Sequence, residues 1–135
     1  MATNVSLERF RSLTAELKQQ VFKDAATELA AQADKLAALI KQVVPRGDTG
    51  ELEHSVRVVP GKTDLVKRVV AGGRPTIRQS VSSKPYDYAR GDEFGTRNMK
   101  AQPFFFPTYR LSRKRIKSAM KRKLTATIKR YSAEK

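Results

Sequence analysis

The chain has 135 residues, a formal net charge of +15 and no cysteine. This length supports one domain with a modest core, which we expect to span residues 1–135. The lack of cysteine excludes disulfides and thiolate metal sites. No apolar run approaches the roughly 20 residues that span a bilayer, and the first residues lack the apolar stretch of a secretion signal. We therefore expect no membrane-spanning segment.

Residues 6–44 are predicted to form one long helix. Apolar side chains recur every three or four positions from Leu7 to Val43, Ser6 is a suitable N-cap, and Pro45 ends the pattern. At about 1.5 Å per residue the helix is nearly 60 Å long, which exceeds the width of a compact domain of this size. It therefore either bends or projects and packs on another subunit. Its alanine-rich middle allows another helix to approach closely.

The middle of the chain, residues 52–107, is predicted to be rich in strands. Asp48 or Thr49 is expected to cap a short helical turn after the Asp48-Thr49-Gly50 sequence. The β-branched runs 55–59 and 65–71, joined by a Pro-Gly turn, indicate a hairpin. Residues 76–82 are either a third strand or an exposed loop, and we expect a mobile loop near 72–86.

An aromatic stretch follows this middle region. Residues 86–95 are predicted to form a short helix or turn that ends at Gly95 with a positive φ. Glu93 is expected to pair with a backbone amide or an arginine rather than to act as a base. Residues 103–106 are predicted to be extended, and adjacent side chains then point to opposite faces. Phe104, Phe105 and Phe106 therefore cannot all face one core, and at least one should meet a second surface.

The last helix is predicted over residues 108–131, with Pro107 opening it. Its expected apolar stripe consists of Ile116, Met120, Leu124, Ile128 and Tyr131. Residues 97–135 hold thirteen Lys and Arg against one acid, Glu134, and so carry +12 of the net +15. Such a charge attracts nucleic acid, acidic protein surfaces or anionic lipid. The expected basic docking face comprises Arg113, Lys114, Arg115, Lys117, Lys121, Arg122 and Lys123.

Residues typical of catalysis are scarce in the sequence. His54 is the single histidine, the acids are scattered, and no glycine-rich phosphate loop is present. We expect no catalytic residue, no metal and no cofactor, and hence a protein that is not an enzyme. The predicted fold class is α+β, with the long N-terminal helix and the basic C-terminal helix packed on a small, mostly antiparallel sheet.

Three ordered motifs resemble a family of small virion proteins of long-tailed bacteriophages, encoded between the head-closure and tail-tube genes. The first motif is Asp48, Thr49, Gly50, Leu52, Ser55 and Val56. The second is Tyr88, Ala89, Glu93, Phe94, Gly95 and Thr96, and the third is Met99, Ala101, Pro103 and Phe104. The chain departs from the family pattern at Lys100, Phe106 and Thr108. Together with the long first helix, the resemblance spans residues 6 to 130.

The resemblance implies a neck or tail-completion protein that forms a homo-oligomeric ring, with sixfold symmetry expected, and joins head to tail. Its partners would be further copies of itself, neighbouring head-closure, tail-terminator or tail-tube proteins, and packaged DNA. It would be assembled in the host cytoplasm and reside in the virion. Subunit contacts are expected at Phe104, Phe105, Phe106, Tyr88, Glu93 and Phe94, and structural turns at Asp48, Thr49, Gly50, Gly95 and Thr96. The alternative is a nucleic-acid-binding protein that uses the helix over residues 108–131.

Overall fold

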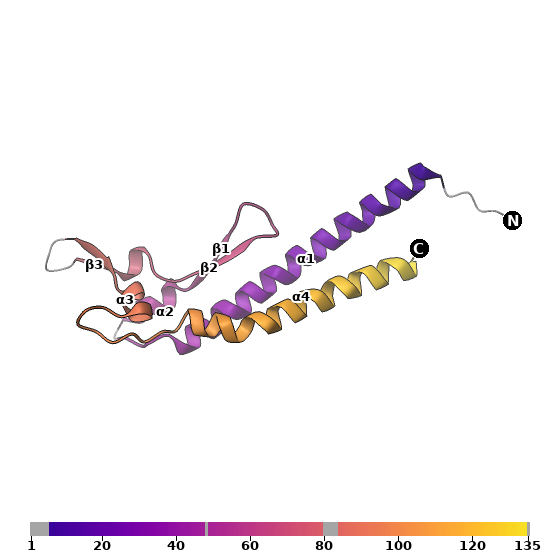
Figure 1. Cartoon of the computed structure of the whole chain (residues 1–135). Helices are drawn as coiled ribbons and strands as arrows, with labels where there is room; N and C mark the ends of the chain where they lie inside the picture. The colour runs from indigo at the N-terminus through magenta and orange to yellow at the C-terminus, as the bar shows by residue number, and fades with distance from the viewer. Residues whose placement is uncertain (1–5, 48, 80–83, 135) are drawn as a thin grey trace.

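A computed structural model describes residues 6–47, 49–79 and 84–134 of the chain. Two long helices, α1 (Leu7–Val43) and α4 (Phe106–Glu134), lie side by side and antiparallel in an elongated molecule (Figure 1). The smaller elements gather at the end where α1 finishes and α4 begins. These are α2 (Glu51–Ser55), β1 (Arg57–Pro60), β2 (Lys67–Val70), η1 (Arg74–Thr76), β3 (Ile77–Gln79), β4 (Pro85–Asp87) and α3 (Tyr88–Phe94). The predicted α+β class is confirmed.

The helix α1 forms as its sequence signals predict. The Ser6 hydroxyl accepts a hydrogen bond from the Arg9 amide at 3.2 Å, and the helix ends just before Val44 and Pro45. Its 37 residues span about 55 Å. Of the two expected arrangements, the helix projects rather than bends, and α4 lies beside it (Figure 1).

Both long helices bury small side chains. On α1 the buried positions include Ala25, Ala33 and Ala37, as the alanine-rich middle suggested. On α4 they are Ser112, Ala119 and Thr127. The expected apolar stripe of α4 was therefore partly wrong, because Ile128 is exposed and the buried positions carry small residues. Small side chains let two helix axes approach closely, so this face is selected by size more than by hydrophobicity.

A polar cluster joins the middle of α1 to the last turns of α4. The Asp24 carboxylate accepts hydrogen bonds from the Thr127 hydroxyl at 2.5 Å and from the Arg130 guanidinium at 3.0 Å. The Thr127 bond, assisted by Arg130 and Gln20, lowers the pKa of Asp24 below its ordinary value despite partial burial. Further along, the Tyr131 hydroxyl donates to the Leu13 carbonyl at 3.0 Å. This end of the pair is therefore fixed by polar contacts.

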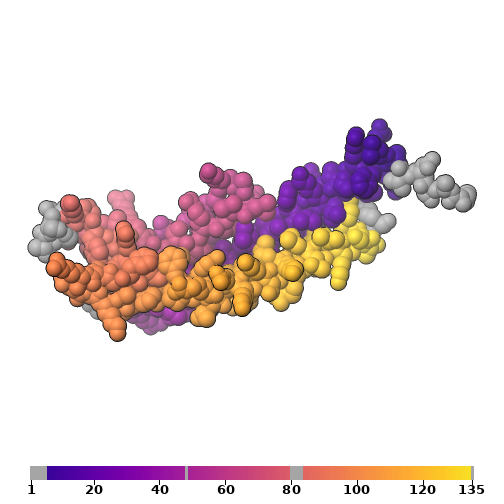
Figure 2. Space-filling view, in the orientation of Figure 1, coloured from indigo at the N-terminus to yellow at the C-terminus, as the bar shows by residue number. Residues whose placement is uncertain are grey.

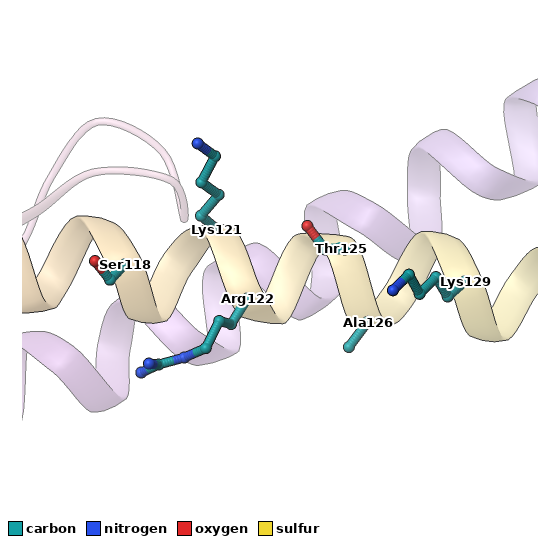
Figure 3. Close-up of a pocket in the computed structure, with 6 residues that line it drawn as sticks. All are labelled: Ser118, Lys121, Arg122, Thr125, Ala126 and Lys129. Atoms are coloured by element: carbon teal, nitrogen blue, oxygen red, sulfur yellow. The ribbon is translucent and has the colours of Figure 1, made fainter.

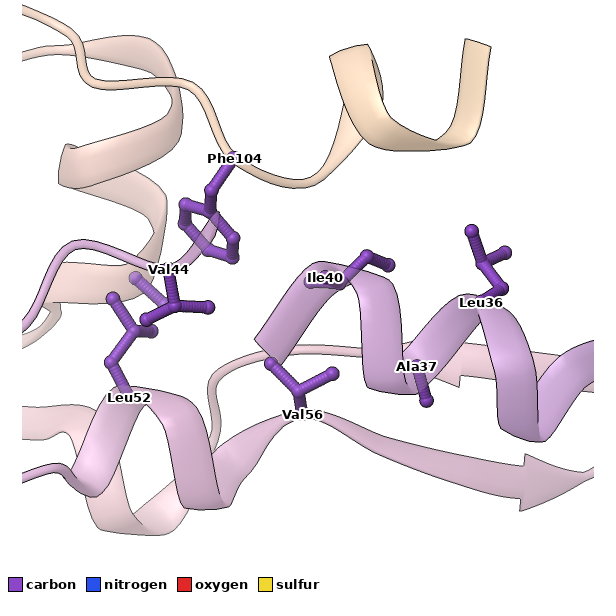
Figure 4. Packing of buried hydrophobic residues seen from close by; sticks show 8 residues of the cluster. Leu36, Ala37, Ile40, Val44, Leu52, Val56 and Phe104 are labelled. Atoms are coloured by element: carbon purple, nitrogen blue, oxygen red, sulfur yellow. The ribbon is translucent and has the colours of Figure 1, made fainter. Parts of the chain in front are cut away.

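The hydrophobic core lies at the opposite end, where the small elements meet the long helices. Leu36, Ile40, Val56 and Phe104 are buried together there (Figure 4). The remaining buried members of the cluster are Ala37, Val44, Leu52 and Ala89. Segments far apart in the sequence thus converge on the last turns of α1, and this convergence places the aromatic stretch against the rest of the molecule.

The strands form two separate antiparallel pairs. In the predicted hairpin, β1 pairs with β2 so that Arg57 lies opposite Val70. In the second pair, β3 lies beside β4, with Ile77 opposite Asp87. Residues 77–79 are therefore a strand rather than an exposed loop. The described part of the expected mobile loop, residues 72–86, holds η1, β3 and β4, while residues 80–83 lie outside the described ranges.

The starts of two helices differ from the expectation in part. Among the described residues no side chain caps α2; Gly50 occupies the N-cap position with φ 65°, a left-handed conformation that suits glycine. Thr49 is therefore not the cap, and Asp48, the other expected cap, lies outside the described residues. The last helix begins at Phe106 instead of residue 108, so Phe106 is helical rather than extended. It continues to Glu134, past the predicted end at residue 131.

Replacing Phe104 with alanine should lower the free energy of unfolding by about 3–5 kcal/mol, because the ring is only 2% exposed and leaves a cavity in the core. Urea denaturation monitored by circular dichroism measures this change. Phe106→Ala is the matched control, since that residue is 44% exposed, and should cost much less. Equal effects of the two substitutions would contradict the assigned core.

The Asp24 cluster should make stability depend on pH. Because the folded-state pKa lies below the ordinary value of 3.8, the carboxylate stabilises the fold at pH values above the unfolded-state pKa. This contribution is lost as the pH falls through the folded-state pKa. The difference in unfolding free energy between the wild type and Asp24→Asn should therefore be largest near neutral pH and shrink in acid. A difference that is independent of pH would refute the role given to the charge.

Candidate functional site

The Glu93 carboxylate connects α3 to the start of α4. Its Oε2 accepts hydrogen bonds from the amides of Phe104 and Phe105, at 2.8 and 2.9 Å. Its Oε1 accepts from the Phe106 amide at 3.0 Å. Amides at a helix start lack partners within the helix, and the positive end of the helix dipole favours an anion there. The predicted pairing of Glu93 with backbone amides is confirmed, and it explains why α4 starts at Phe106.

The three consecutive phenylalanines differ in how deeply they are buried. Phe104 is buried in the core, Phe105 is partly buried, and Phe106 is 44% exposed. Phe94, at the end of α3, is 64% exposed, and its ring centroid lies 5.9 Å from that of Phe106. We call Phe94, Phe105 and Phe106 the aromatic patch. Of the expected contact residues, Phe104 and Glu93 are almost enclosed within the chain, and both also border the pocket described next.

An open, mostly apolar pocket of about 300 Å³ lies beside the aromatic patch. Strand β2 contributes Val69 and Val70 to its lining, and α3 contributes Ala89 and Arg90. The other lining residues are the three rings of the patch together with Ala71, Asp87, Glu93 and Phe104. Exposed apolar surface of this kind is characteristic of interaction sites.

The remaining expected contact residue, Tyr88, is covered by an arginine. The Arg78 guanidinium lies over the Tyr88 ring, 5.3 Å from its centroid, and also pairs with the Glu51 carboxylate. Gly95 has φ 77°, as predicted. A Cβ on Gly95 would lie 3.0 Å from the Ala101 nitrogen, so the turn has little room for a side chain. Thr96 forms an isolated antiparallel bridge with Met99 immediately afterwards.

The structure brings the first two sequence motifs together. Thr49 and Gly50 line a cleft of about 280 Å³ with Tyr88 and Asp92. Burial raises the pKa of the Asp92 carboxyl. Behind this cleft the Ser55 hydroxyl donates to the Leu52 carbonyl at 2.6 Å and accepts from the Gly72 amide at 2.9 Å. These motif residues therefore form internal connections of the fold.

Sequence reasoning missed Asp87. Its carboxylate accepts hydrogen bonds from the Gly73 amide at 2.9 Å, the Thr76 hydroxyl at 2.6 Å and the Ala89 amide at 3.0 Å. It therefore caps α3 and holds the Gly72-Gly73 turn against it. An aspartate directly before a short helix is an N-cap signal, but the bonds to residues 73 and 76 depend on the tertiary fold.

The outer side of α4 forms the second candidate surface. Figure 2 shows this helix, orange to yellow, exposed along the length of the molecule. A shallow notch of about 510 Å³ on its surface is lined by Ser118, Lys121, Arg122, Thr125, Ala126 and Lys129 (Figure 3). Three cations thus surround small and hydroxyl side chains, a combination suited to anionic groups. Of the seven predicted docking cations, Lys123 is partly buried and the other six are exposed.

Among the described residues, no group of three or more His, Cys, Asp and Glu side chains is arranged to hold a metal ion. No helix in the described ranges is long and apolar enough to cross a membrane.

Replacing Glu93 with glutamine should lower the free energy of unfolding by about 1.5–3 kcal/mol, the range for hydrogen bonds to a charged group. Glutamine has one acceptor oxygen, so its NH₂ group would face an amide that also needs an acceptor. Chemical denaturation of Glu93→Gln and of the control Glu53→Gln measures the difference. The control should stay within about 0.5 kcal/mol of the wild type, and an equally mild effect at Glu93 would argue against its structural role.

A comparison with protein-family models matches residues 8–95 to the HK97 gp10-like family, described as "Bacteriophage HK97-gp10, putative tail-component". The match runs from α1 to the end of α3, so α4 and the rings of Phe105 and Phe106 lie outside it. Searches among curated proteins and among solved structures each found no match. Because the matched region covers more than half of the 135 residues, the chain belongs to the HK97 gp10-like family of bacteriophage proteins.

Proposed function

We propose that this protein is a structural component of the phage neck or tail top, where copies of it form a ring that takes part in joining the head to the tail. The observation that carries the proposal is the aromatic patch. Phe94 and Phe106 are exposed on a backbone that the buried Glu93 carboxylate fixes in place. A rigid apolar surface at one end of an elongated chain suits a subunit contact, and membership in a phage tail-component family supports a virion role.

Electrostatics supports contact with other virion proteins. The cations of α4 repel one another along an exposed helix, and an acidic neighbouring surface would relieve this repulsion. We propose the head-closure, tail-terminator or tail-tube proteins as those neighbours. Within a ring, the basic helices of adjacent copies would stay apart for the same reason.

The proposed activity is binding rather than catalysis. Two buried or partly buried carboxylates already serve the fold, because Glu93 accepts hydrogen bonds from three backbone amides and Asp87 accepts them from two amides and a hydroxyl. These hydrogen bonds occupy the carboxylate oxygens, so neither group is available to act on a substrate.

A second candidate function, binding to nucleic acid, is favoured by the notch on α4. Lys121, Arg122 and Lys129 could contact phosphates there, with the hydroxyls of Ser118 and Thr125 between them. This function predicts an affinity for duplex DNA that falls steeply as the salt concentration rises.

The mass of the purified protein in solution distinguishes the two functions. We would measure it by light scattering at low and high salt, with and without duplex DNA. Closed multimers that ignore DNA would support the neck protein. A monomer that binds DNA in a complex that dissociates at high salt would instead support the nucleic-acid binder.

Charge reversal tests whether α4 docks on virion partners. In a phage that carries the substitutions, Lys117→Glu, Lys121→Glu and Arg122→Glu together should prevent heads from joining tails, because the docking face changes sign. Lys123 is left unchanged, since it helps to lower the pKa of Asp24 in the helix pair. Electron microscopy of lysates counts joined particles, and circular dichroism of the purified variant should show an intact fold.

The matched control reverses three exposed cations of the strand region, Lys62, Arg68 and Arg74. It should leave joining unaffected. Normal particles from the α4 variant, or an equal loss from the control, would count against a docking role for α4.

A further inference from the structure

A second apolar surface lies at the end of the molecule farthest from the aromatic patch. Leu7 and Phe10 occupy the first turns of α1 and are 62% and 58% exposed. Residues three apart share one face of a helix, so the two side chains form a single projection, which we call the N-terminal knob. They belong to the periodic stripe that buries Leu36 and Ile40 at the other end of α1. The stripe therefore continues into turns where these side chains stay largely exposed.

The knob and the aromatic patch cannot meet within one chain. The patch lies beside α3 and the start of α4, and the knob lies near the N-terminus at the opposite end (Figure 1). The length of α1, about 55 Å, separates them. Contact between the two surfaces therefore requires two copies of the protein.

The charges around the two surfaces are complementary. Residues 85–95, which supply five of the eleven residues that line the pocket, contain Asp87, Asp92 and Glu93 against Arg90, a net charge of −2 in a chain of +15. The hydrogen-bond donors to the Glu93 and Asp87 carboxylates are amides and a hydroxyl, none of which carries a formal positive charge. Residues 6–11 carry two arginines and one glutamate, a net charge of +1. The basic helix α4 is also positive. However, its exposed face carries cations, which do not suit a pocket with apolar walls.

We propose that Leu7 and Phe10 of one copy insert into the pocket beside the aromatic patch of the next copy. The Phe10 ring would join the Phe94 and Phe106 rings, whose spacing of 5.9 Å is typical of favourable aromatic contacts. The contact uses different surfaces on the two copies, so it is heterologous and generates a ring when the rotation between copies closes. The inference rests on the proposed self-assembly and assigns the residues that perform it.

The absence of cysteine from the chain allows a direct test. The cysteines are placed beside the contact so that Phe10 and Phe94 are kept: Arg11 follows Phe10 directly, and Arg90 lines the pocket. We would mix the Arg11→Cys protein with the Arg90→Cys protein and add a short bis-maleimide cross-linker. The expected product is a cross-linked dimer of the two variants, formed at least tenfold faster than with the control pair Arg11→Cys and Leu111→Cys. Leu111 is 86% exposed, so reactivity alone would favour the control.

Serine substitutions provide an independent measurement. Phe10→Ser and Phe94→Ser should each shift the association midpoint, measured by light scattering, to at least tenfold higher concentration, whereas Leu111→Ser should not. An equimolar mixture of the two variants should form dimers and nothing larger, because each pair keeps only one intact contact. Circular dichroism should show that both exposed substitutions leave the fold unchanged.

A cross-linking rate no higher than that of the control would overturn the inference. Efficient linking of Arg11→Cys to itself would also overturn it, because that product indicates a symmetric contact between knobs. The proposed function has a separate readout, the presence of the chain in the neck of joined particles. If the chain is found there but the cysteine pair does not cross-link, the inference fails and the function stands. If the cysteine pair cross-links but the chain is absent from joined particles, the function fails and the contact stands.

Discussion

The buried Glu93 carboxylate is the interaction on which the arrangement of this protein depends. Three consecutive amides, of Phe104, Phe105 and Phe106, need acceptors where α4 begins, and one side chain from α3 supplies them all. Leaving such amides buried and unbonded would cost free energy at each one. The same contact directs Phe104 into the core and leaves Phe106 outside it. An internal hydrogen-bond network thereby determines which aromatic rings are available to a partner.

The two long helices are joined differently at their two ends. Near the small elements, Leu36, Ile40 and Phe104 contribute to a hydrophobic core. Towards the termini the contact depends on small side chains and on the bonds that Asp24 makes to Thr127 and Arg130. Hydrophobic burial tolerates changes of pH and salt, whereas a charged cluster responds to both. The molecule therefore combines a robust end with an end that is sensitive to solution conditions.

The elements that depend on neighbouring residues could be predicted from the sequence. Ser6 and Pro45 predicted the two ends of α1, the Pro-Gly turn predicted the hairpin, and Gly95 predicted the end of α3. The start of α4 could not be predicted, because its capping carboxylate comes from Glu93, outside the helix. The buried face of α4 was missed because Ser112 and Thr127 look like surface residues until α1 lies against them. Asp87 was overlooked for a similar reason, since two of its three donors come from the 73–76 segment.

The separation between the core and the free ends of the helix pair has a mechanical consequence. A pair about 55 Å long that is anchored at one end acts as a lever arm. A rotation of about 10° at the core would move the far end by roughly 10 Å at that length. Repacking of a few side chains around Ile40 would therefore be amplified into a large displacement of the opposite end. Such a lever would let identical chains accommodate neighbours with different geometries without altering their own fold.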